Sequence, residues 1–571
     1  MMDKKTIYVV IGCLLALFVW QRVVEQMYPP KKKPLRPPVA MLATNAPTAQ
    51  AAQQQIGTTT AAATTNVAVE TIKAEPEQPR PTEQIKVLSN NFVHVEVTSW
   101  GGGIRSVELL KYNAGVHGHV VLNGTNFVPA LALRGLPGLD SGGAYQLQQK
   151  DARTIEMTAK SLAGVTVTKT LALSDDYVVN GSIEVARPAS PGTQRAIDVV
   201  VGTATPVGGK EVPDFLGMDT MVGVKCRAQS LWDTQGFFIF RSKVLSLKET
   251  NEVLSARWVD VKNQFFTMIL TPTTNTLAVG FERGPAPKPA FWESKVTPQG
   301  VTAWATLPTS TVSTAGVERY EFRYYAGPKE LDRLATLGQG QEEVLNFGFW
   351  GFFSVILLKS MKFFYQIIPN YGVAIIIITV IIKLLFWPIQ AKSIRSMKEM
   401  QKFQPLVAKL KEKYKDDPQR LNQETMRLYK EHKINPFAGC LPMLVQIPVF
   451  FGLFAMLRSA IELRGAPFLW IKDLSLPDTI FHVAGFPFNP LPLAMTAASV
   501  WQMKLTPQTG DSQQQKMMAF MPLMMLFFFY STSSGLVLYW TVQQLLSVAQ
   551  QWWSLREPSN TVAIAPAGKT K

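Results

Sequence analysis

The chain has 571 residues, which is too many for a single domain, and it carries a formal net charge of +16. Hydrophobic residues make up 47% and charged residues only 17%, against about 25% charged residues in soluble proteins, which indicates a membrane protein. Of three cysteines, only Cys226 lies outside the apolar segments, so a domain stapled by disulfide bonds is excluded.

The N-terminal residues 1–28 are predicted to form a membrane anchor, in which Lys4 and Lys5 precede an apolar stretch from Ile7 to Trp20. A cleaved signal peptide is the alternative. No Ala-x-Ala cleavage site follows the stretch, so an uncleaved anchor with its N-terminus in the cytoplasm is favoured. Residues 29–84 are rich in Ala, Thr, Gln and Pro. They carry too few large apolar side chains to build a core and are predicted to be a flexible linker.

Residues 85–337 are predicted to form a large all-β domain outside the cytoplasm. Short runs such as Phe92–Val97 and Val165–Leu171 alternate apolar and polar side chains, and Asn-Gly pairs mark turns between them. About 250 residues of this texture predict an antiparallel β-sandwich. His117 and His119 share one face of a strand, which is a weak metal-site pattern. The domain shows no catalytic motif, and we predict no catalytic residue, cofactor or metal.

Residues 338–369 are predicted to form an amphipathic helix that lies in the membrane interface. The segment Phe347–Tyr365 is rich in aromatic residues and ends with Lys359 and Lys362, a composition typical of an interfacial helix. A sixth membrane span is the alternative.

Residues 370–556 are predicted to form an all-α core with five membrane spans and a cytoplasmic helical hairpin at 392–435. The connection 392–433 carries twelve Lys and Arg against six Asp and Glu, so it is placed in the cytoplasm by the excess of positive charge. Both chain termini then lie in the cytoplasm, and the short tail is 557–571. The predicted spans are Tyr371–Ala391, Phe437–Leu457, Pro487–Met503, Met517–Tyr530 and Gly535–Trp553.

Lys383 is the one charged residue found within these spans. At about 1.5 Å per residue from Gly372 it lies roughly 17 Å into the membrane. A charge there costs about 2.5–3.5 kcal/mol and usually faces a hydrated cavity or a partner. A lysine that extends its amine to the membrane surface is the alternative, but about eight apolar residues follow it, about 12 Å of helix.

The hairpin is predicted to break at Asp417, which would cap the second helix, and Pro418, which would be its first residue. The hairpin is either a solvated basic arm or a docking site for a nascent chain, a ribosome or lipid headgroups. Basic charge alone does not decide between these.

Several ordered motifs in this part of the chain resemble the YidC family of membrane protein insertases. With the anchor, linker and large β domain, the whole chain resembles the Gram-negative type. The matching segments are IIIIT at 375–379, NPFAGCLP at 435–442, QIPVF at 446–450, ELRGAPF at 462–468, QQKMMAFMPLMM at 514–525 and SGLVLYW at 534–540.

The resemblance implies a hydrated groove in the membrane, open to the cytoplasm and to lipid and lined by polar residues around one cation. Here the cation is Lys383, where the family commonly has arginine. Trp540 stands where a tyrosine is common. The groove residues implied are Lys383, Thr379, Gln446, Tyr539, Trp540 and Gln543.

An apolar slide beside the groove is also implied, along which substrate segments leave into lipid. Its methionines suit a surface that must accept many apolar partners; ordinary lipid-facing packing is the alternative. The slide residues implied are Pro442, Ile447, Pro448 and Leu453 on one span and Met521, Pro522, Met525 and Phe528 on another. The β domain resembles the family's supersandwich, which is similar in shape to sugar-mutarotase folds.

The expected function is insertion and folding of proteins of the bacterial inner membrane, alone or with the Sec translocon. The expected partners are nascent inner-membrane proteins, the Sec translocon with its accessory subunits, and membrane lipids. No direct nucleic-acid contact is expected. The tail has too few basic residues to carry ribosome binding by itself.

Two other classes of function are alternatives. A secondary transporter would also place an ionisable residue in mid-membrane, but the internal repeats and paired charges of such proteins are not seen. A membrane-tethered carbohydrate-active protein would explain the β domain, but it would leave Lys383 and the basic hairpin without a role.

Overall fold

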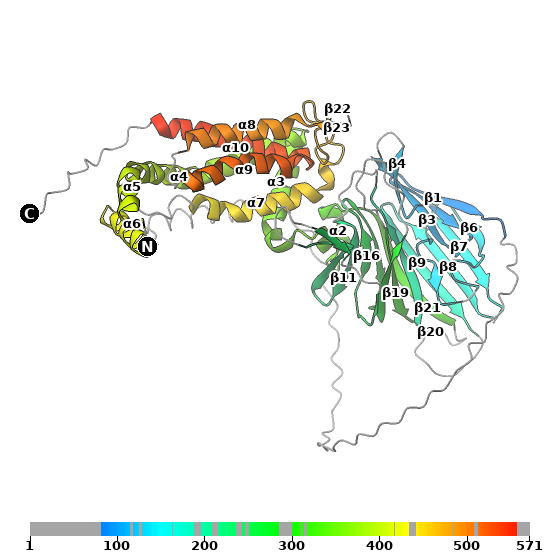
Figure 1. The fold of residues 1–571 in the computed structure, drawn as a ribbon. Helices are drawn as coiled ribbons and strands as arrows, with labels where there is room; N and C mark the ends of the chain where they lie inside the picture. The colour runs from blue at the N-terminus through cyan, green and yellow to red at the C-terminus, as the bar shows by residue number, and fades with distance from the viewer. Residues whose placement is uncertain are drawn as a thin grey trace, which may run out of the picture.

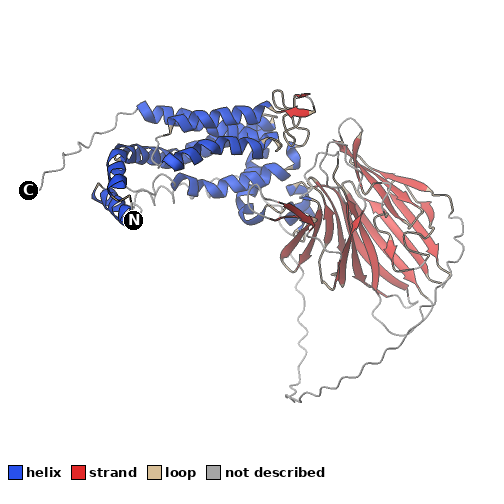
Figure 2. Ribbon diagram, viewed as in Figure 1, coloured by secondary structure: helices blue, strands red, loops and turns tan. Residues whose placement is uncertain are grey.

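The structure, a computed structural model, describes residues 81–556 with gaps. The gaps are 115–117, 125–127, 137, 163, 188–195, 208–214, 236–241, 246–249, 285–299, 310, 313–316, 416, 433–440, 484 and 507–511. The predicted anchor 1–28, nearly all of the linker 29–84, the tail 557–571 and His117 lie outside the described residues. A β domain stands at one end of the molecule and a helical bundle at the other (Figures 1 and 2).

The β domain confirms the predicted antiparallel architecture. Within the described residues its main layers are a ten-stranded sheet, in the order β12-β11-β16-β17-β21-β9-β8-β7-β6 with β20 beside β21, and a five-stranded sheet, β15-β18-β19-β10-β5. A four-stranded sheet, β1-β2-β3-β4, and the pair β13-β14 complete it. The strands are β1 Ile85–Ser89, β2 Val93–Thr98, β3 Gly103–Asn113, β4 His119–Leu122, β5 Leu133–Arg134, β6 Gln146–Gln149, β7 Thr154–Lys160, β8 Thr166–Leu173, β9 Val178–Ala186, β10 Ala196–Ala204, β11 Gly217–Val222, β12 Lys225–Ser230, β13 Trp232–Gln235, β14 Ser242–Leu245, β15 Thr250–Glu252, β16 Val259–Lys262, β17 Phe266–Pro272, β18 Ala278–Gly284, β19 Gly300–Pro308, β20 Thr311–Val312 and β21 Val317–Pro328.

The two larger sheets pack face to face, because β10 and β19 lie against β16 and β17. Alternation along each strand points one set of side chains into the space between the layers. Tyr320 and Tyr324, which share one face of β21, are fully buried there. The Tyr324 hydroxyl donates to the Val201 carbonyl, 2.8 Å away on the opposite sheet. The space between the sheets therefore holds large aromatic side chains whose buried hydroxyl groups are paired.

Lys169 is a charged residue at a core position of this domain. Its side chain points to the same side of β8 as those of the buried Val167 and Leu171, and it is 1% exposed. Its Nζ donates to the carbonyls of Gly101, Gly102 and Leu131 at 3.0, 2.8 and 3.0 Å. The amine thus ties the Gly101–Gly102 turn to β8.

We expect Lys169→Met to destabilise the β domain by roughly 2–3 kcal/mol, because three buried carbonyl oxygens lose their donor. Burial lowers the pKa of Lys169 to about 7 in the folded state, from an ordinary value of 10.5. Between pH 7 and about 10 the unfolded chain therefore binds more protons, so this residue makes wild-type stability rise with pH. The measurement is the urea concentration at half-unfolding of the full-length protein, determined by pulse proteolysis. The difference in this midpoint between the wild type and Lys169→Met should grow from pH 7 to pH 10. A difference that stays constant over this pH range would contradict the prediction.

A short helical connection leads from the β domain to the bundle. It consists of α2 Leu331–Leu337, the 3-10 turns η4 Gln341–Leu345 and η5 Gly348–Trp350, and the helix α3 Gly351–Ile367. One face of α3 packs on α4 and α7. The Ser354 hydroxyl donates to the Gly452 carbonyl at 2.8 Å, and a side chain at Gly452 would collide with Phe353. Gly452 therefore allows α3 and α7 a close approach.

Ion pairs and hydrogen bonds tie the two parts of the molecule together. The Lys362 ammonium on α3 lies 3.6 Å from Glu330, 2.5 Å from Asp332 and 3.7 Å from Glu462. Glu330 and Asp332 belong to the start of α2, whereas Glu462 follows the bundle helix α7. The Gln264 amide also donates to the Arg458 carbonyl at 2.7 Å. These contacts thus join the β domain to the bundle near the α2–α3 junction.

The bundle contains five helices at the places where membrane spans were predicted. They are α4 Tyr371–Lys402, α7 Leu441–Ser459, α8 Pro490–Leu505, α9 Ser512–Phe529 and α10 Ser534–Arg556. Helix α10 packs on α4, α7 and α8, and α9 packs on α8. By length and composition, α4 is the one helix in the described part of the chain that is clearly able to cross a membrane; Leu444–Ser459 and Ala519–Phe529 are shorter apolar stretches.

The predicted hairpin consists of α5 Gln404–Lys413 and α6 Pro418–Glu431. It lies at the end of the bundle away from the β domain (Figure 1). The predicted break is confirmed, because α6 begins at Pro418 and the Asp417 carboxylate accepts from the Arg420 amide at 2.9 Å. At the base of the hairpin the rings of Phe403 and His432 are 4.6 Å apart. Two loop strands, β22 Phe481–Val483 and β23 Phe486–Phe488, pair between α7 and α8.

Candidate functional site

Lys383 lies in the interior of the bundle rather than on its surface. It is 3% exposed, and its Nζ donates to the Ser547 hydroxyl on α10 at 2.8 Å. Ser547 in turn donates to the Gln543 carbonyl at 2.8 Å. No carboxylate of a described residue lies within ion-pair distance of this ammonium. The cation is therefore held by one hydroxyl, without a counter-charge.

Thr379 lies one helical turn before Lys383 on α4, as its spacing predicted. It is fully buried, and its hydroxyl donates to the Ile375 carbonyl at 2.7 Å. The Thr379 hydroxyl proton is therefore committed to its own helix, while its oxygen can still accept a hydrogen bond.

The predicted polar residues of α10 share an uncommon property. The Tyr539 hydroxyl, the Trp540 Nε1 and the Gln543 Oε1 are each buried without a hydrogen-bond partner among the described protein atoms. An unpaired buried polar group costs about 1–3 kcal/mol. Three such atoms within five residues of one helix, beside a buried cation, form a concentrated polar region in an otherwise apolar bundle.

Helix α7 closes the other side of this region. The Gln446 side chain is half-buried and is the polar neighbour of the Tyr539 hydroxyl, without reaching hydrogen-bond geometry. The Trp540 ring packs edge-on against Phe450 of α7, with the ring centroids 5.0 Å apart. It also contacts the Phe529 ring of α9, with the centroids 5.6 Å apart. Trp540 thus lies between α7 and α9. Of the other predicted groove residues, Gln446 and Tyr539 are neighbours. Lys383 is linked through Ser547 to the backbone of Gln543, whereas Thr379 contacts the backbone of its own helix.

The predicted slide residues are divided between surface and interior. Ile447 and Pro448 on α7 are half-buried, whereas Leu453 is 1% exposed and packs inside the bundle. Leu453 therefore supports α7 from behind and presents no surface. The Pro442 side chain lies outside the described residues.

On α9, Met521 is 53% exposed, Met525 and Phe528 are half-buried, and Pro522 is buried. The most exposed apolar side chains among the described residues of the two helices were not predicted. They are Leu444 and Phe451 on α7 and Phe520, Leu523 and Phe527 on α9. Their spacings of three, four and seven residues place each set on one helix face, which is a signal that the sequence does contain.

Sequence reasoning also missed the residues that position the cation. Ser547, four residues after Gln543, holds the Lys383 amine. One turn further toward the C-terminal end of α10, Gln550 is 1% exposed, and its amide donates to the Trp387 carbonyl at 3.3 Å. Trp387 precedes Pro388, whose ring removes a backbone donor from α4. Gln550 thus supports α4 at the point where the helix is weakest.

No group of His, Cys, Asp and Glu side chains able to hold a metal occurs in the described part of the chain. The described side chains of the polar region are one ammonium, one phenol, one indole, hydroxyls and amides. This set can donate and accept hydrogen bonds and attract negative charge.

Comparison with known proteins gives matches over nearly the whole chain. A family model described as 60Kd inner membrane protein matches residues 363–560, and one described as YidC periplasmic domain matches residues 84–360. A curated protein named membrane protein insertase YidC, from Pelobacter propionicus, is 34% identical over 96% of this chain and 98% of its own length. The protein of the same name from Nitratidesulfovibrio vulgaris strain DP4 is 31% identical over 98% of this chain and 100% of its own. A solved structure of an active YidC insertase is 18% identical, covers 82% of this chain and 92% of its own, and has a TM-score of 0.34.

Proposed function

The chain belongs to the YidC family of membrane protein insertases, and we propose that it inserts its substrates through a polar groove formed by Lys383 and the polar residues of α7 and α10. It is an insertase of the inner membrane with a periplasmic domain, and it is not an enzyme. Membership of the family gives the class of activity, and the side chains of this chain support the mechanism.

One observation carries the proposed groove: a buried cation without a carboxylate partner lies beside three unpaired polar atoms in the bundle. In an apolar surrounding each unpaired atom is costly. Water, or the backbone of a passing polypeptide, would supply the missing partners at a much lower cost. A polar segment that enters this region would exchange hydrogen bonds rather than lose them.

The proposed mechanism uses two forces. The uncompensated charge of Lys383 attracts acidic side chains of the segment that must cross. An inside-negative membrane potential adds about 2.3 kcal/mol per negative charge per 100 mV in the outward direction. The apolar segment of the substrate then moves over the exposed face of α9 and α7 into lipid, where its hydrophobic burial completes the reaction.

The proposed orientation places the hairpin and both termini in the cytoplasm and α3 at the outer membrane surface. The basic charge of residues 392–433 supports this. The position of the hairpin at the opposite end from the periplasmic domain is consistent with it (Figure 1). Nascent inner-membrane proteins are the proposed substrates. The Sec translocon with its accessory subunits, and the ribosome through surfaces other than the tail, are proposed partners.

Site-specific photo-crosslinking during insertion tests the groove. A photoreactive amino acid at Gln543, in the groove, or at Phe527, on the exposed face of α9, should crosslink to a stalled nascent membrane protein. The matched control is Trp501 on α8, which is 55% exposed but does not lie on the proposed route of the substrate. Equal crosslinking at all three positions would show that the substrate samples the whole lipid-facing surface, and the groove would be wrong.

The β domain is proposed to support the insertase rather than to carry it out. We expect a chain that lacks residues 85–328 to keep at least about half of the wild-type insertion rate, a change of under 0.5 kcal/mol. The cut must fall after Pro328, because a cut at Tyr320 would leave eight of the twelve residues of β21 unpaired. The cut at Pro328 also keeps Glu330 and Asp332, the partners of Lys362. Protease protection of a model substrate measures the rate.

A second deletion that extends to Leu337 is the matched control, because it removes these two partners of Lys362 as well. It should lower insertion further than the 85–328 deletion does. Complete loss of insertion in the 85–328 deletion, with the protein present in the membrane at the wild-type amount, would contradict a supporting role.

A further inference from the structure

A pocket lies where the connection from the β domain meets α3, far from the polar groove. It has a volume of about 490 Å³ and is formed by α2, η4, η5 and the first half of α3. Its apolar wall includes Leu331, Phe347, Phe352, Val355 and Ile356. A pocket of this size accommodates a small organic group.

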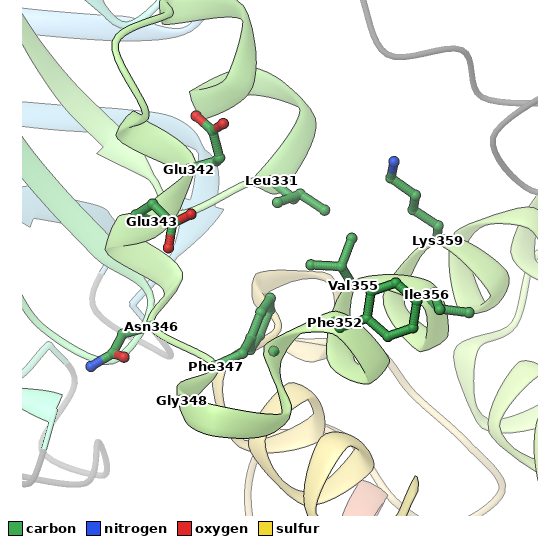
Figure 3. Close-up of a pocket in the computed structure, with 11 residues that line it drawn as sticks. Leu331, Glu342, Glu343, Asn346, Phe347, Gly348, Phe352, Val355, Ile356 and Lys359 are labelled. Carbon is green, nitrogen blue, oxygen red and sulfur yellow. The ribbon is translucent and has the colours of Figure 1, made fainter. Parts of the chain in front are cut away.

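The charged residues of the pocket stand on opposite sides of it. Glu342 and Glu343, both on η4, lie on one side, and Lys359 of α3 lies on the other, with Leu331 and Val355 between them (Figure 3). None of the three forms an ion pair with a described residue. Lys362, one turn further along α3, is in contrast committed to three carboxylates. Lys359 and the two glutamates are therefore available to a ligand.

The surroundings of the pocket point to the membrane surface. Phe352 lines the pocket and is 54% exposed, and the neighbouring Phe349 is 91% exposed. Exposed aromatic rings, followed within a few turns by a lysine such as Lys359, are typical of a segment at the level of the lipid headgroups. A ligand that enters here can place a charged group between Glu343 and Lys359 and an apolar chain along Phe352.

We propose that this pocket binds a phospholipid with an ethanolamine headgroup from the outer leaflet. The lipid phosphate would pair with Lys359, its primary ammonium with Glu342 and Glu343, and its acyl chain would lie over Phe352. A primary ammonium has three N–H donors for the two carboxylates, whereas a choline group has none. An anionic lipid without an ammonium fits poorly, because one lysine against two glutamates leaves the pocket with a charge of −1.

This inference goes beyond insertion. It rests only on the proposed location of α3 at the outer membrane surface. A lipid bound here would bridge η4, which belongs to the β-domain side of the connection, and α3, which packs on the bundle. It would thus act as a replaceable spacer between the periplasmic domain and the membrane.

The test uses the full-length protein in liposomes with three photoactivatable lipids that have identical acyl chains and ethanolamine, choline or glycerol headgroups. Labelled peptides are mapped by mass spectrometry. The ethanolamine lipid should label the segment 347–359 about tenfold more than the other two, the factor expected from one charge-assisted hydrogen bond. Lys359→Ala should lower this labelling. The double variant Glu342→Gln with Glu343→Gln should abolish the preference over the choline lipid.

Lys472→Ala is the matched control, because Lys472 is an exposed lysine in the loop between α7 and α8, outside the pocket. It should leave the labelling pattern unchanged. Equal labelling by all three lipids, or a preference that survives the double glutamine variant, would overturn the proposal. Insertion activity, measured in the same liposomes, separates the two proposals. Selective labelling with a failed groove test would leave the lipid site standing, and the reverse result would leave the groove standing.

Discussion

Deletion of the hairpin, residues Gln404–Glu431, is expected to lower insertion at least about tenfold, an effect of roughly 1.4 kcal/mol on the rate-limiting step. The hairpin stands at the end of the bundle away from the periplasmic domain (Figure 1), and these residues carry seven Lys and Arg against five Asp and Glu. In the proposed orientation the hairpin faces the cytoplasm, so we expect it to meet a nascent substrate before the groove does.

The structure makes this deletion interpretable. Neither α5 nor α6 contains a buried residue, so their removal opens no cavity in the bundle. A short Gly-Ser linker between Phe403 and His432, whose rings are in contact, would replace the hairpin at its base. Helix α4 would keep its full length to Lys402. We therefore expect the five bundle helices to stay in the membrane, as measured by resistance to carbonate extraction.

A single charge reversal in the hairpin is the matched control. Lys409 is exposed on α5, and scattered surface charges contribute only about 0–1 kcal/mol each. Lys409→Glu should therefore insert substrates nearly as well as the wild type. If this one substitution were as harmful as the deletion, the hairpin would act through a specific contact and not through its overall charge.

Elements with strong local signals could be predicted from the sequence. Alternation revealed the β domain, apolar runs revealed the five bundle helices, and Asp417-Pro418 revealed the break in the hairpin. The helix ends were less well predicted. Met517–Tyr530 was expected as a short apolar span, but α9 starts at Ser512. The polar residues 513–516 continue the helix because backbone hydrogen bonds do not depend on hydropathy.

The buried polar region of the bundle could be predicted in part. Lys383 was evident because a charge in an apolar span is costly, but its partner Ser547 lies 164 residues away in the chain and has no local signal. The same limit applies to Lys169. Its phase along β8 shows that it points inward, yet the three carbonyls that hold it come from segments that only the folded domain brings together.

Substitution of Lys383 is expected to change which substrates are inserted as well as how fast. Lys383→Met keeps the side-chain length but removes the charge, so insertion of a substrate with an acidic translocated segment should fall about tenfold, the factor expected from the loss of one partly screened attraction. A neutral segment should be affected less, and a basic segment least. Lys383→Arg keeps the charge and should insert all three nearly as the wild type does.

Lys383→Glu gives the sharpest test, because attraction becomes repulsion for acidic segments and repulsion becomes attraction for basic ones. In liposomes without a membrane potential, which would otherwise favour the acidic segment, the order of preference should then be inverted, with the basic segment inserted best. Protease protection of the outer segment, for three substrates that differ only in that segment, measures the order. Ser547→Ala is the matched control: it removes the hydroxyl that holds the amine but leaves the charge, so it should reduce insertion of all three substrates by a similar small factor and keep their order. If Lys383→Glu slowed all three substrates equally, the residue would act by packing the bundle, and the proposed electrostatic role of the groove cation would be wrong.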